Sequence, residues 1–223
     1  MDILYACNDA YAPFAGTSIF SLLENNSSIQ NIRIFIVLDH VSMDNQKKLT
    51  ETVEEYGHQI VLIDAEEVNA LLEKLGVPMY RGSYATHYRK FFSMFLPEDV
   101  ERLLYIDSDS VILGDLGYLV DCDLQGKCIG VVLDALGGRY KRLLGFEREE
   151  PYFNAGVTLI DVEMWNLKQY SNRLLEHIVN VRAKYCNPDQ DLFNIILKDD
   201  VFILRKPSIM STTNHKTPHC CRV

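Results

Sequence analysis

Short apolar runs alternate with amphipathic segments through most of the chain, and this alternation restricts the fold more than any other feature of the sequence. The runs have the length of buried strands, whereas the segments between them show helical spacing of their apolar residues. Strands separated by helices of this length pair in parallel through right-handed crossovers. The expected strands are residues 2–7, 32–38, 59–63 and 103–106, and the expected helices are residues 16–25, 42–56, 65–75 and 86–95.

The alternation continues less regularly in the second half of the chain. Pro188 suits the first position of a helix, and Ser42 suits the cap of an earlier one. Further strands are expected at residues 127–133, 156–161 and 201–204, and further helices at residues 163–184 and 189–197. No linker or internal repeat interrupts the pattern. Residues 1–223 are therefore expected to form one α/β domain with a mostly parallel central sheet flanked by helices.

Two aspartates, Asp107 and Asp109, directly follow the expected strand at residues 103–106. Alternate residues of a strand point to the same side, so both carboxylates would converge where the strand ends. Two converging anions are costly unless a cation neutralises them, and Mn²⁺ or Mg²⁺ suits oxygen ligands and substrate phosphates. The pair therefore indicates a metal–diphosphate site, although aspartate and serine are also common in simple turns.

The overall charge restricts the partners. A formal net charge of −9 argues against nucleic acid or an anionic membrane, because both favour basic surfaces. An acidic chain that handles phosphates needs a local cation, which again favours a metal. No apolar run approaches the length of a transmembrane segment, and the start of the chain lacks the basic flank of a signal peptide. A cytoplasmic location with reduced cysteines is expected, and the sequence does not indicate an oligomeric state.

Polar residues follow other expected strands as well. Asn8, Asp9 and Tyr11 come after the first strand, and Asp134 follows the strand at residues 127–133. In doubly wound sheets, ligands bind at the carboxyl ends of the strands, so these residues are expected near the aspartate pair. For Asn8 and Asp9 alone, an ordinary strand-to-helix turn is the simpler interpretation.

Three further segments carry candidate residues. Arg89 lies on an expected helix, where it suits a phosphate but also fits an exposed face. Asn154 and Ala155 stand among small residues that enter a strand and permit close approach of a ligand. Asp189 and Gln190 fall in the first turn of a helix, where capping explains the aspartate but not the glutamine.

Taken together, these segments resemble a retaining glycosyltransferase with the GT-A fold, of family 8, which includes bacterial lipopolysaccharide galactosyl- and glucosyltransferases and glycogenin. The order and spacing of the segments carry the resemblance, which covers most of the chain. The matching segments are I-L-Y-A-C-N-D-A-Y at residues 3–11, Y-R at 88–89, L-Y-I-D-S-D at 104–109, Y-F-N-A-G-V at 152–157 and D-Q-D at 189–191.

The resemblance implies a Rossmann-like nucleotide-diphospho-sugar transferase. It implies transfer of a hexose from UDP-glucose or UDP-galactose to an acceptor hydroxyl with retention of anomeric configuration. The implied acceptor is a cell-surface glycan or a lipid-linked saccharide, as in lipopolysaccharide biosynthesis. The implied cofactor is Mn²⁺, with Mg²⁺ as the alternative, and Asp107 and Asp109 would ligate the ion that bridges the diphosphate.

The resemblance also implies roles for the remaining candidates. Asp189 and Gln190 would lie on the reacting face, and the absence of a convincing nucleophile favours same-face attack. The backbone of Ser108 would lie near the ribose. The residues implied to hold uridine are Ala6, Asn8, Asp9 and Tyr11, and those implied around the donor sugar are Arg89, Asp134, Asn154 and Ala155.

The chain departs from the family pattern at its C-terminal end. Family members continue into an H-x-x-G-x-K-P-W segment whose histidine is a third metal ligand, and residues 214–223 do not match it. His215 and His219 are therefore not equated with that ligand. Two alternatives stay open: a non-catalytic UDP-sugar-binding protein, and a haloacid-dehalogenase-like phosphatase. The phosphatase pattern D-x-D-x-[TV] fits residues 107–111 but leaves the other segments unexplained.

Overall fold

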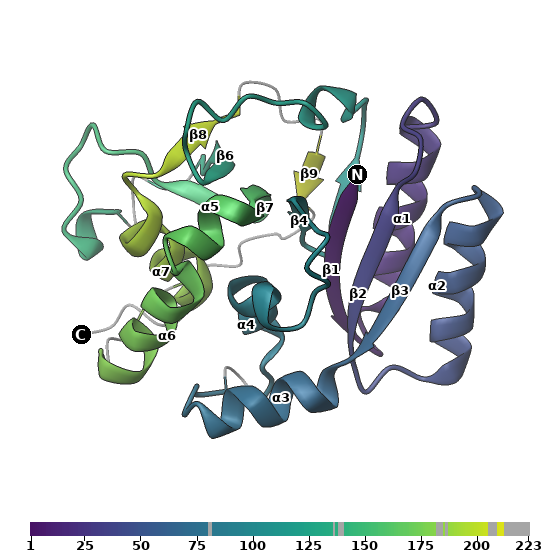
Figure 1. The fold of residues 1–223 in the computed structure, drawn as a ribbon, viewed down its shortest axis with the longest axis horizontal. Helices are drawn as coiled ribbons and strands as arrows, with labels where there is room; N and C mark the ends of the chain where they lie inside the picture. The colour runs from purple at the N-terminus through teal and green to yellow at the C-terminus, as the bar shows by residue number, and fades with distance from the viewer. Residues whose placement is uncertain are drawn as a thin grey trace.

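A mixed seven-stranded sheet forms the centre of the structure, a computed structural model that describes residues 1–79, 82–135, 137, 141–181, 185, 187–204 and 209–211. The strand order is β3-β2-β1-β4-β7-β6-β8 (Figure 1). These strands are β1 (Asp2–Asn8), β2 (Arg33–Asp39), β3 (Gln59–Asp64), β4 (Arg102–Ile106), β6 (Ile129–Leu133), β7 (Phe153–Asp161) and β8 (Val201–Ile203). Two short strands, β5 (Ser110–Ile112) and β9 (Ile209–Ser211), form a separate antiparallel pair.

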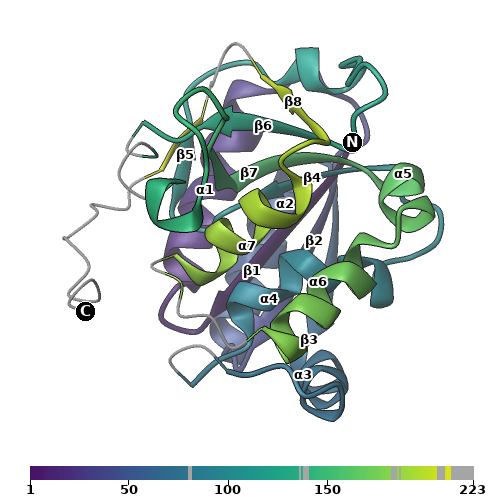
Figure 2. The same cartoon turned by 90° about the vertical axis from the view of Figure 1, so that its left-hand side faces the viewer.

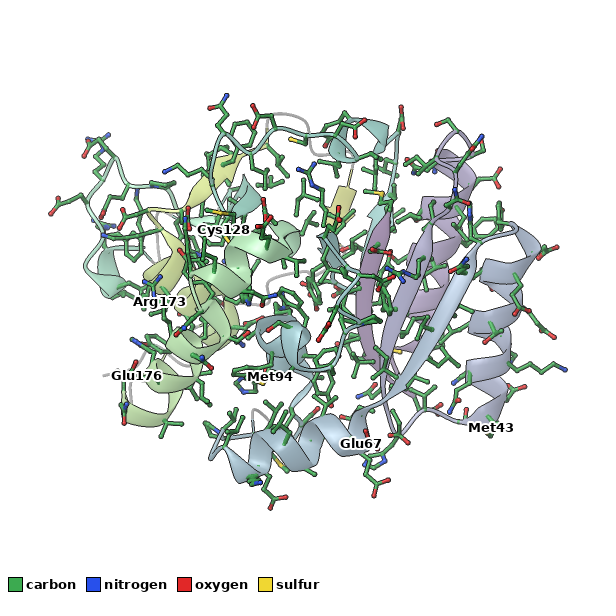
Figure 3. The ribbon with its side chains drawn as sticks, viewed as in Figure 1. Met43, Glu67, Met94, Cys128, Arg173 and Glu176 are labelled. Atoms are coloured by element: carbon green, nitrogen blue, oxygen red, sulfur yellow. The ribbon has the colours of Figure 1, made fainter. Side chains whose placement is uncertain are left out.

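Helices cover both faces of this sheet. α1 (Ala12–Asn25) and α2 (Met43–Glu55) pack on one face, and the other helices pack on the opposite face (Figures 1 and 2). The latter are α3 (Ala65–Lys74), α4 (Ala85–Phe91), α5 (Val162–Leu167), α6 (Tyr170–Asn180) and α7 (Pro188–Leu197). Short 3-10 turns occur at Phe92–Met94, Gly117–Leu119 and Lys141–Leu144. Charged side chains such as Glu67 and Glu176 point outward from the layers (Figure 3).

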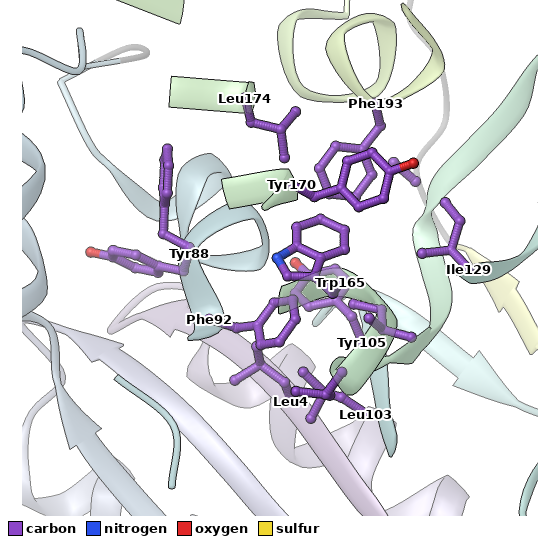
Figure 4. Close-up of a cluster of buried hydrophobic side chains, with 14 of the residues drawn as sticks. Leu4, Tyr88, Phe92, Leu103, Tyr105, Ile129, Trp165, Tyr170, Leu174 and Phe193 are labelled. Carbon is purple, nitrogen blue, oxygen red and sulfur yellow. The ribbon is translucent and has the colours of Figure 1, made fainter. Parts of the chain in front are cut away.

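An aromatic cluster fills the space between the sheet and the helices α4 to α7 (Figure 4). Trp165 is fully buried at its centre, and the ring centroids of Phe92, Tyr170 and Phe193 lie 5.1, 5.4 and 6.0 Å from its own. The indole N–H donates to Ser171 Oγ, so the one polar atom of the ring is satisfied. This packing fixes the helices that carry Arg89 and Gln190 against the sheet.

The α/β class is confirmed, but the direction of one strand was not predicted. β7 runs antiparallel to both β4 and β6, whereas the other neighbours in the sheet are parallel. Antiparallel neighbours need no helical crossover, and the described part of the connection from β6 to β7 holds only a 3-10 turn. The pair β5–β9 was not predicted either. The cap at Ser42 is confirmed, because its side chain accepts from Asn45 N–H at 3.4 Å.

The single helix expected over residues 163–184 is wrong. Two helices, α5 and α6, replace it, and between them Gln169 adopts a left-handed conformation with φ of 53°. The break brings Lys168 Nζ and the Tyr170 hydroxyl to the buried carboxylate of Asp200, at 2.6 Å each. Amphipathic spacing continues on both sides of the break, so periodicity alone does not reveal it. The last three residues of the predicted helix lie outside the described part of the chain.

Candidate active site

The aspartate pair lies beyond the carboxyl end of β4, in a turn rather than on the strand. Ser110 N–H donates to the Asp107 carbonyl at 3.1 Å and closes this turn. The buried Ser108 hydroxyl donates to the Ala6 carbonyl at 2.7 Å, which ties the turn to the end of β1. Strand alternation is therefore not what brings the pair together. The two groups still interact, because burial and the charge of Asp107 both raise the pKa of Asp109.

Arg89 connects the aspartate pair to α7. Its side chain is only 7% exposed, and its guanidinium lies 2.8 Å from Asp107 Oδ1 and 3.1 Å from Asp189 Oδ2. It also donates to the Ala155 carbonyl at 2.7 Å and lies 4.3 Å from the centroid of the Tyr105 ring. The Tyr105 hydroxyl donates to the same Asp107 oxygen at 2.9 Å. Arg89 is therefore a buried connection between α4, the turn after β4, β7 and α7, and the exposed-face interpretation is wrong.

The strand β7 approaches Asp107 so closely that only glycine fits at position 156. A Cβ on Gly156 would clash with Asp107 Oδ2 and would lie 2.9 Å from Asn154 Oδ1. The Gly156 carbonyl accepts from Asp107 N–H at 2.7 Å, and Gly156 N–H donates to Asn154 Oδ1 at 2.7 Å. The small residues were predicted to permit close approach of a ligand. In the structure they permit close approach of the aspartate.

Gln190, the residue that capping does not explain, is held on both sides of its amide. Its Oε1 accepts from Ala155 N–H at 3.2 Å, and its Nε2 donates to Asp134 Oδ2 at 2.7 Å. One helical turn later, Asn194 donates to the Phe153 carbonyl and accepts from Phe153 N–H, both at 2.8 Å. These contacts fasten α7 to β7 and give the Gln190 amide one orientation.

Two cations lie beside Asp189. Burial alone would raise the pKa of the Asp189 carboxyl, but the charges of Arg89 and Lys90 hold it below its usual value. Lys90 is almost completely buried, and its ammonium donates to the Thr86 carbonyl at 2.7 Å and to His87 Nδ1 at 3.4 Å. Burial lowers the pKa of Lys90 to about 7 even though Asp189 opposes the effect. Because Arg89 and Lys90 hold the pKa of Asp189 below its usual value, Asp189 is ionised at neutral pH.

A polar turn follows β1 at the same edge of the sheet as the aspartate pair. Asn8 Oδ1 accepts from Tyr11 N–H at 3.0 Å, so Asn8 has the ordinary turn role. The Tyr11 side chain precedes α1 and is 49% exposed, which leaves its ring available for stacking. The Asp9 carboxylate accepts from Ser42 N–H and from the Asn45 side chain of α2.

The aspartate pair fits a hard divalent cation with few protein ligands. Arg89 and Tyr105 occupy Asp107 Oδ1, and no hydrogen bond from a described residue engages Oδ2. The raised pKa of Asp109 reflects burial first and the neighbouring charge of Asp107 second, and a bound cation would offset both. The described ranges contain no group of three or more His, Cys, Asp or Glu side chains suited to a metal. Mg²⁺-like ions commonly bind through one or two carboxylates and substrate phosphates, so two aspartates suffice for such a site.

Sequence reasoning missed Tyr105, Lys90 and Asn194. Tyr105 stands two residues before Asp107, so alternation along β4 could have placed it on the same side. Asn194 lies four residues after Gln190 and therefore on the same helix face. The pattern of α4 gives no signal that separates the buried Lys90 from an exposed lysine. His215 and His219 lie outside the described residues.

Comparison with known proteins establishes the family. A family model described as glycosyl transferase family 8 matches residues 2–214. The chain belongs to this family. Among the relatives of this family 8 chain, General stress protein A of Bacillus subtilis is 28% identical over 92% of the chain and 71% of its own length. Lipopolysaccharide 1,2-glucosyltransferase of Escherichia coli K12 is 29% identical over 89% of the chain and 58% of its own length.

Solved structures of glycosyltransferases show the same fold. The galactosyltransferase LgtC, crystallised in complex with donor and acceptor sugar analogues, superposes with a TM-score of 0.74 and 26% identity. The match covers 92% of this chain and 73% of LgtC. The expected GT-A fold is therefore confirmed. Within the part of the chain that the structure describes, no helix is long and apolar enough to cross a membrane.

Proposed function

We propose that this family 8 glycosyltransferase moves a hexose from a UDP-sugar to an acceptor hydroxyl with retention of configuration, using Mn²⁺ bound by Asp107 and Asp109. The observation that carries the proposal is the convergence of this pair with Arg89, Asp189 and Gln190 at one edge of the sheet. UDP-glucose and UDP-galactose are the proposed donors, because the relatives include a glucosyltransferase and a galactosyltransferase. A cell-surface glycan or lipid-linked saccharide is the proposed acceptor, since one relative acts on lipopolysaccharide by its name.

The chain's own residues orient the donor and stabilise its leaving group. When bound, the metal supplies Lewis-acid stabilisation of the charge on the departing diphosphate. Arg89 fixes the orientation of Asp107 and keeps Asp189 ionised. Asp189 is paired with Arg89, and Gln190 Oε1 accepts from Ala155 N–H, so both candidate nucleophiles are already engaged. This arrangement supports attack by the acceptor hydroxyl on the same face that the diphosphate leaves.

The direct test is a donor panel. UDP-glucose, UDP-galactose and their N-acetyl forms are incubated with the protein and Mn²⁺, and released UDP is measured. Asp109→Ala should abolish release, whereas Asp121→Ala, which removes an exposed aspartate, should not change it. Release by the Asp109→Ala variant would show that the metal assignment is wrong. A trapped glycosyl adduct at Asp189 or Gln190 would overturn same-face attack.

The same assay separates the alternatives. Binding of UDP without release of UDP from any donor would favour the non-catalytic binder. The phosphatase alternative has lost its support, because the chain belongs to another family and its aspartate pair follows β4 rather than the first strand. Hydrolysis of an aryl phosphate with Mg²⁺, without binding of UDP, would restore it.

A further inference from the structure

A polar hollow lies at the opposite edge of the sheet from the candidate active site. It has a volume of about 480 Å³ and is lined by the turn before β6, the break between α5 and α6, and the end of α7. Figure 3 shows Arg173 of α6 and Cys128, which directly precedes β6, on the same side of the molecule. Asp189 and Gln190 lie at the other end of α7, and a helix of ten residues is about 15 Å long. The hollow is therefore separate from the reacting centre.

The lining of the hollow carries an excess of positive charge. Lys127, Lys168 and Arg173 contribute three cations, and Asp199 and Asp200 contribute two carboxylates. Lys168 is neutralised within the fold, because its ammonium lies 2.6 Å from Asp200 Oδ2. The carboxylate of Asp199 is on an exposed residue at the rim. One positive charge is left even when Asp199 is counted, in a chain whose formal net charge is −9.

Lys127 and Arg173 are held in place by groups that do not neutralise them. Within the described residues, no Asp or Glu oxygen lies at salt-bridge distance from either cation. Lys127 Nζ donates to the Asp199 carbonyl at 2.8 Å, which fixes the ammonium and leaves its other N–H donors for a ligand. The Arg173 guanidinium lies over the Tyr170 ring, 4.7 Å from its centroid. A stacked guanidinium still presents its N–H donors at its edge, where they suit phosphate oxygens.

Both turns that supply the lysines have an uncommon backbone conformation. Gln125, two residues before Lys127, and Gln169, directly after Lys168, each have a φ of 53°. This left-handed conformation is unfavourable for a residue with a side chain, and such positions are often found where a ligand binds. In both turns the unfavourable residue is followed or preceded by a lysine that lines the hollow.

We propose that this hollow is an anion site that binds a phosphate monoester group through Lys127 and Arg173. Such a group carries a charge of about −1.5 to −2 at neutral pH and offers only acceptor oxygens, which match cations that have donors but no carboxylate partner. The group can belong to a small soluble molecule or to a lipid headgroup. The acidic chain as a whole repels a strongly anionic membrane, which favours the soluble ester. This inference goes beyond the proposed function and does not depend on it.

The test is calorimetric titration of the full chain with sodium phosphate at constant ionic strength, without nucleotide or divalent metal. The wild type should bind phosphate. Arg173→Ala and Lys127→Met should each weaken this binding at least about tenfold, because each removes one charge-assisted contact. Arg142→Ala is the matched control, since it removes an exposed arginine that does not line the hollow, and it should bind phosphate as the wild type does. Thermal melting without phosphate shows whether each variant is folded.

Flotation with lipid vesicles identifies the source of the phosphate group. Binding to phosphatidylcholine vesicles that contain phosphatidic acid, with loss of that binding in Arg173→Ala, would assign the site to a lipid headgroup. Binding of free phosphate without binding of these vesicles would assign it to a soluble ester. A wild type that binds neither would overturn the proposal, as would folded Arg173→Ala and Lys127→Met variants that bind with wild-type affinity. None of these results bears on the release of UDP, which tests the proposed function separately.

Discussion

Replacement of Lys90 by methionine tests the electrostatics of the site most directly. His87 Nε2 lies 3.1 Å from the Pro78 carbonyl and must donate to it, so Nδ1 is the unprotonated nitrogen that accepts from Lys90. His87 is therefore neutral, and burial together with the Lys90 charge lowers its pKa to about 3. Within the described residues, no carboxylate lies at salt-bridge distance from the Lys90 ammonium. The native state consequently holds a buried cation without a direct anionic partner.

The size of the effect follows from the pKa of Lys90. Burial lowers this pKa from 10.5 to about 7, and one pH unit corresponds to about 1.4 kcal/mol, so keeping the proton costs the native state about 5 kcal/mol. Methionine has a similar length and removes the charge. It also leaves His87 Nδ1 without its donor, which costs about 1 kcal/mol. We expect Lys90→Met to be about 4 kcal/mol more stable than the wild type at pH 6.5, measured by urea unfolding.

This advantage must shrink as the pH rises. Between about pH 7 and pH 10.5 the unfolded chain keeps the Lys90 proton while the native state loses it. The unfolded state then binds more protons, so wild-type stability rises with pH across this window. At pH 9.5 the difference between variant and wild type should fall below about 1 kcal/mol. Lys48→Met is the control, because Lys48 is exposed and Asp44 raises its pKa, so its effect should not vary over this range. A Lys90→Met difference that stays constant from pH 6.5 to 9.5 would refute the reasoning.

Three further substitutions test the contacts of the site. Gly156→Ala should displace Asp107, because the added Cβ would clash with a carboxylate oxygen of that residue. Mn²⁺ binding, measured by electron paramagnetic resonance, should weaken at least about tenfold. The circular dichroism spectrum should not change. Arg89→Met should lower the free energy of unfolding by about 3–5 kcal/mol, because it leaves two carboxylates without their cation. Asn194→Ala should cost about 2–4 kcal/mol by leaving the buried N–H and carbonyl of Phe153 unpaired, and an unchanged urea midpoint would contradict this.

The sequence predicted the elements of the fold better than their directions. Periodicity identifies a buried strand from its apolar residues, and β1 to β4 and β6 to β8 were all recognised in this way. Periodicity carries no information on which neighbour a strand pairs with, so the antiparallel β7 was not predicted. The break at Gln169 was missed because it is caused by Lys168 and Tyr170 reaching Asp200, a residue about thirty positions away in the chain.

The candidate site was also predicted only in part. The rule that ligands bind at the carboxyl ends of strands brought Asp9, Asp107 and Asp134 to one edge of the sheet, where the structure places them. The burial of Arg89 was not predicted, because helical spacing does not distinguish a buried arginine from one exposed to water. Its position depends on Asp107 and Asp189, which belong to distant segments and meet only in the folded chain.

The balance of charge in the site indicates why a divalent cation fits it. Asp107, Asp109, Asp134 and Asp189 contribute four carboxylates, and Arg89 and Lys90 contribute at most two cations, because the pKa of Lys90 is lowered to about 7. At least two negative charges are therefore left uncompensated. Arg89 contacts both Asp107 and Asp189, whereas the pKa of Asp109 is raised by burial first and by the charge of Asp107 second. One Mn²⁺ would match this residual charge and relieve the strained carboxylate. Asp109→Asn, which removes one of the two charges while preserving shape, should therefore weaken Mn²⁺ binding without lowering the free energy of unfolding.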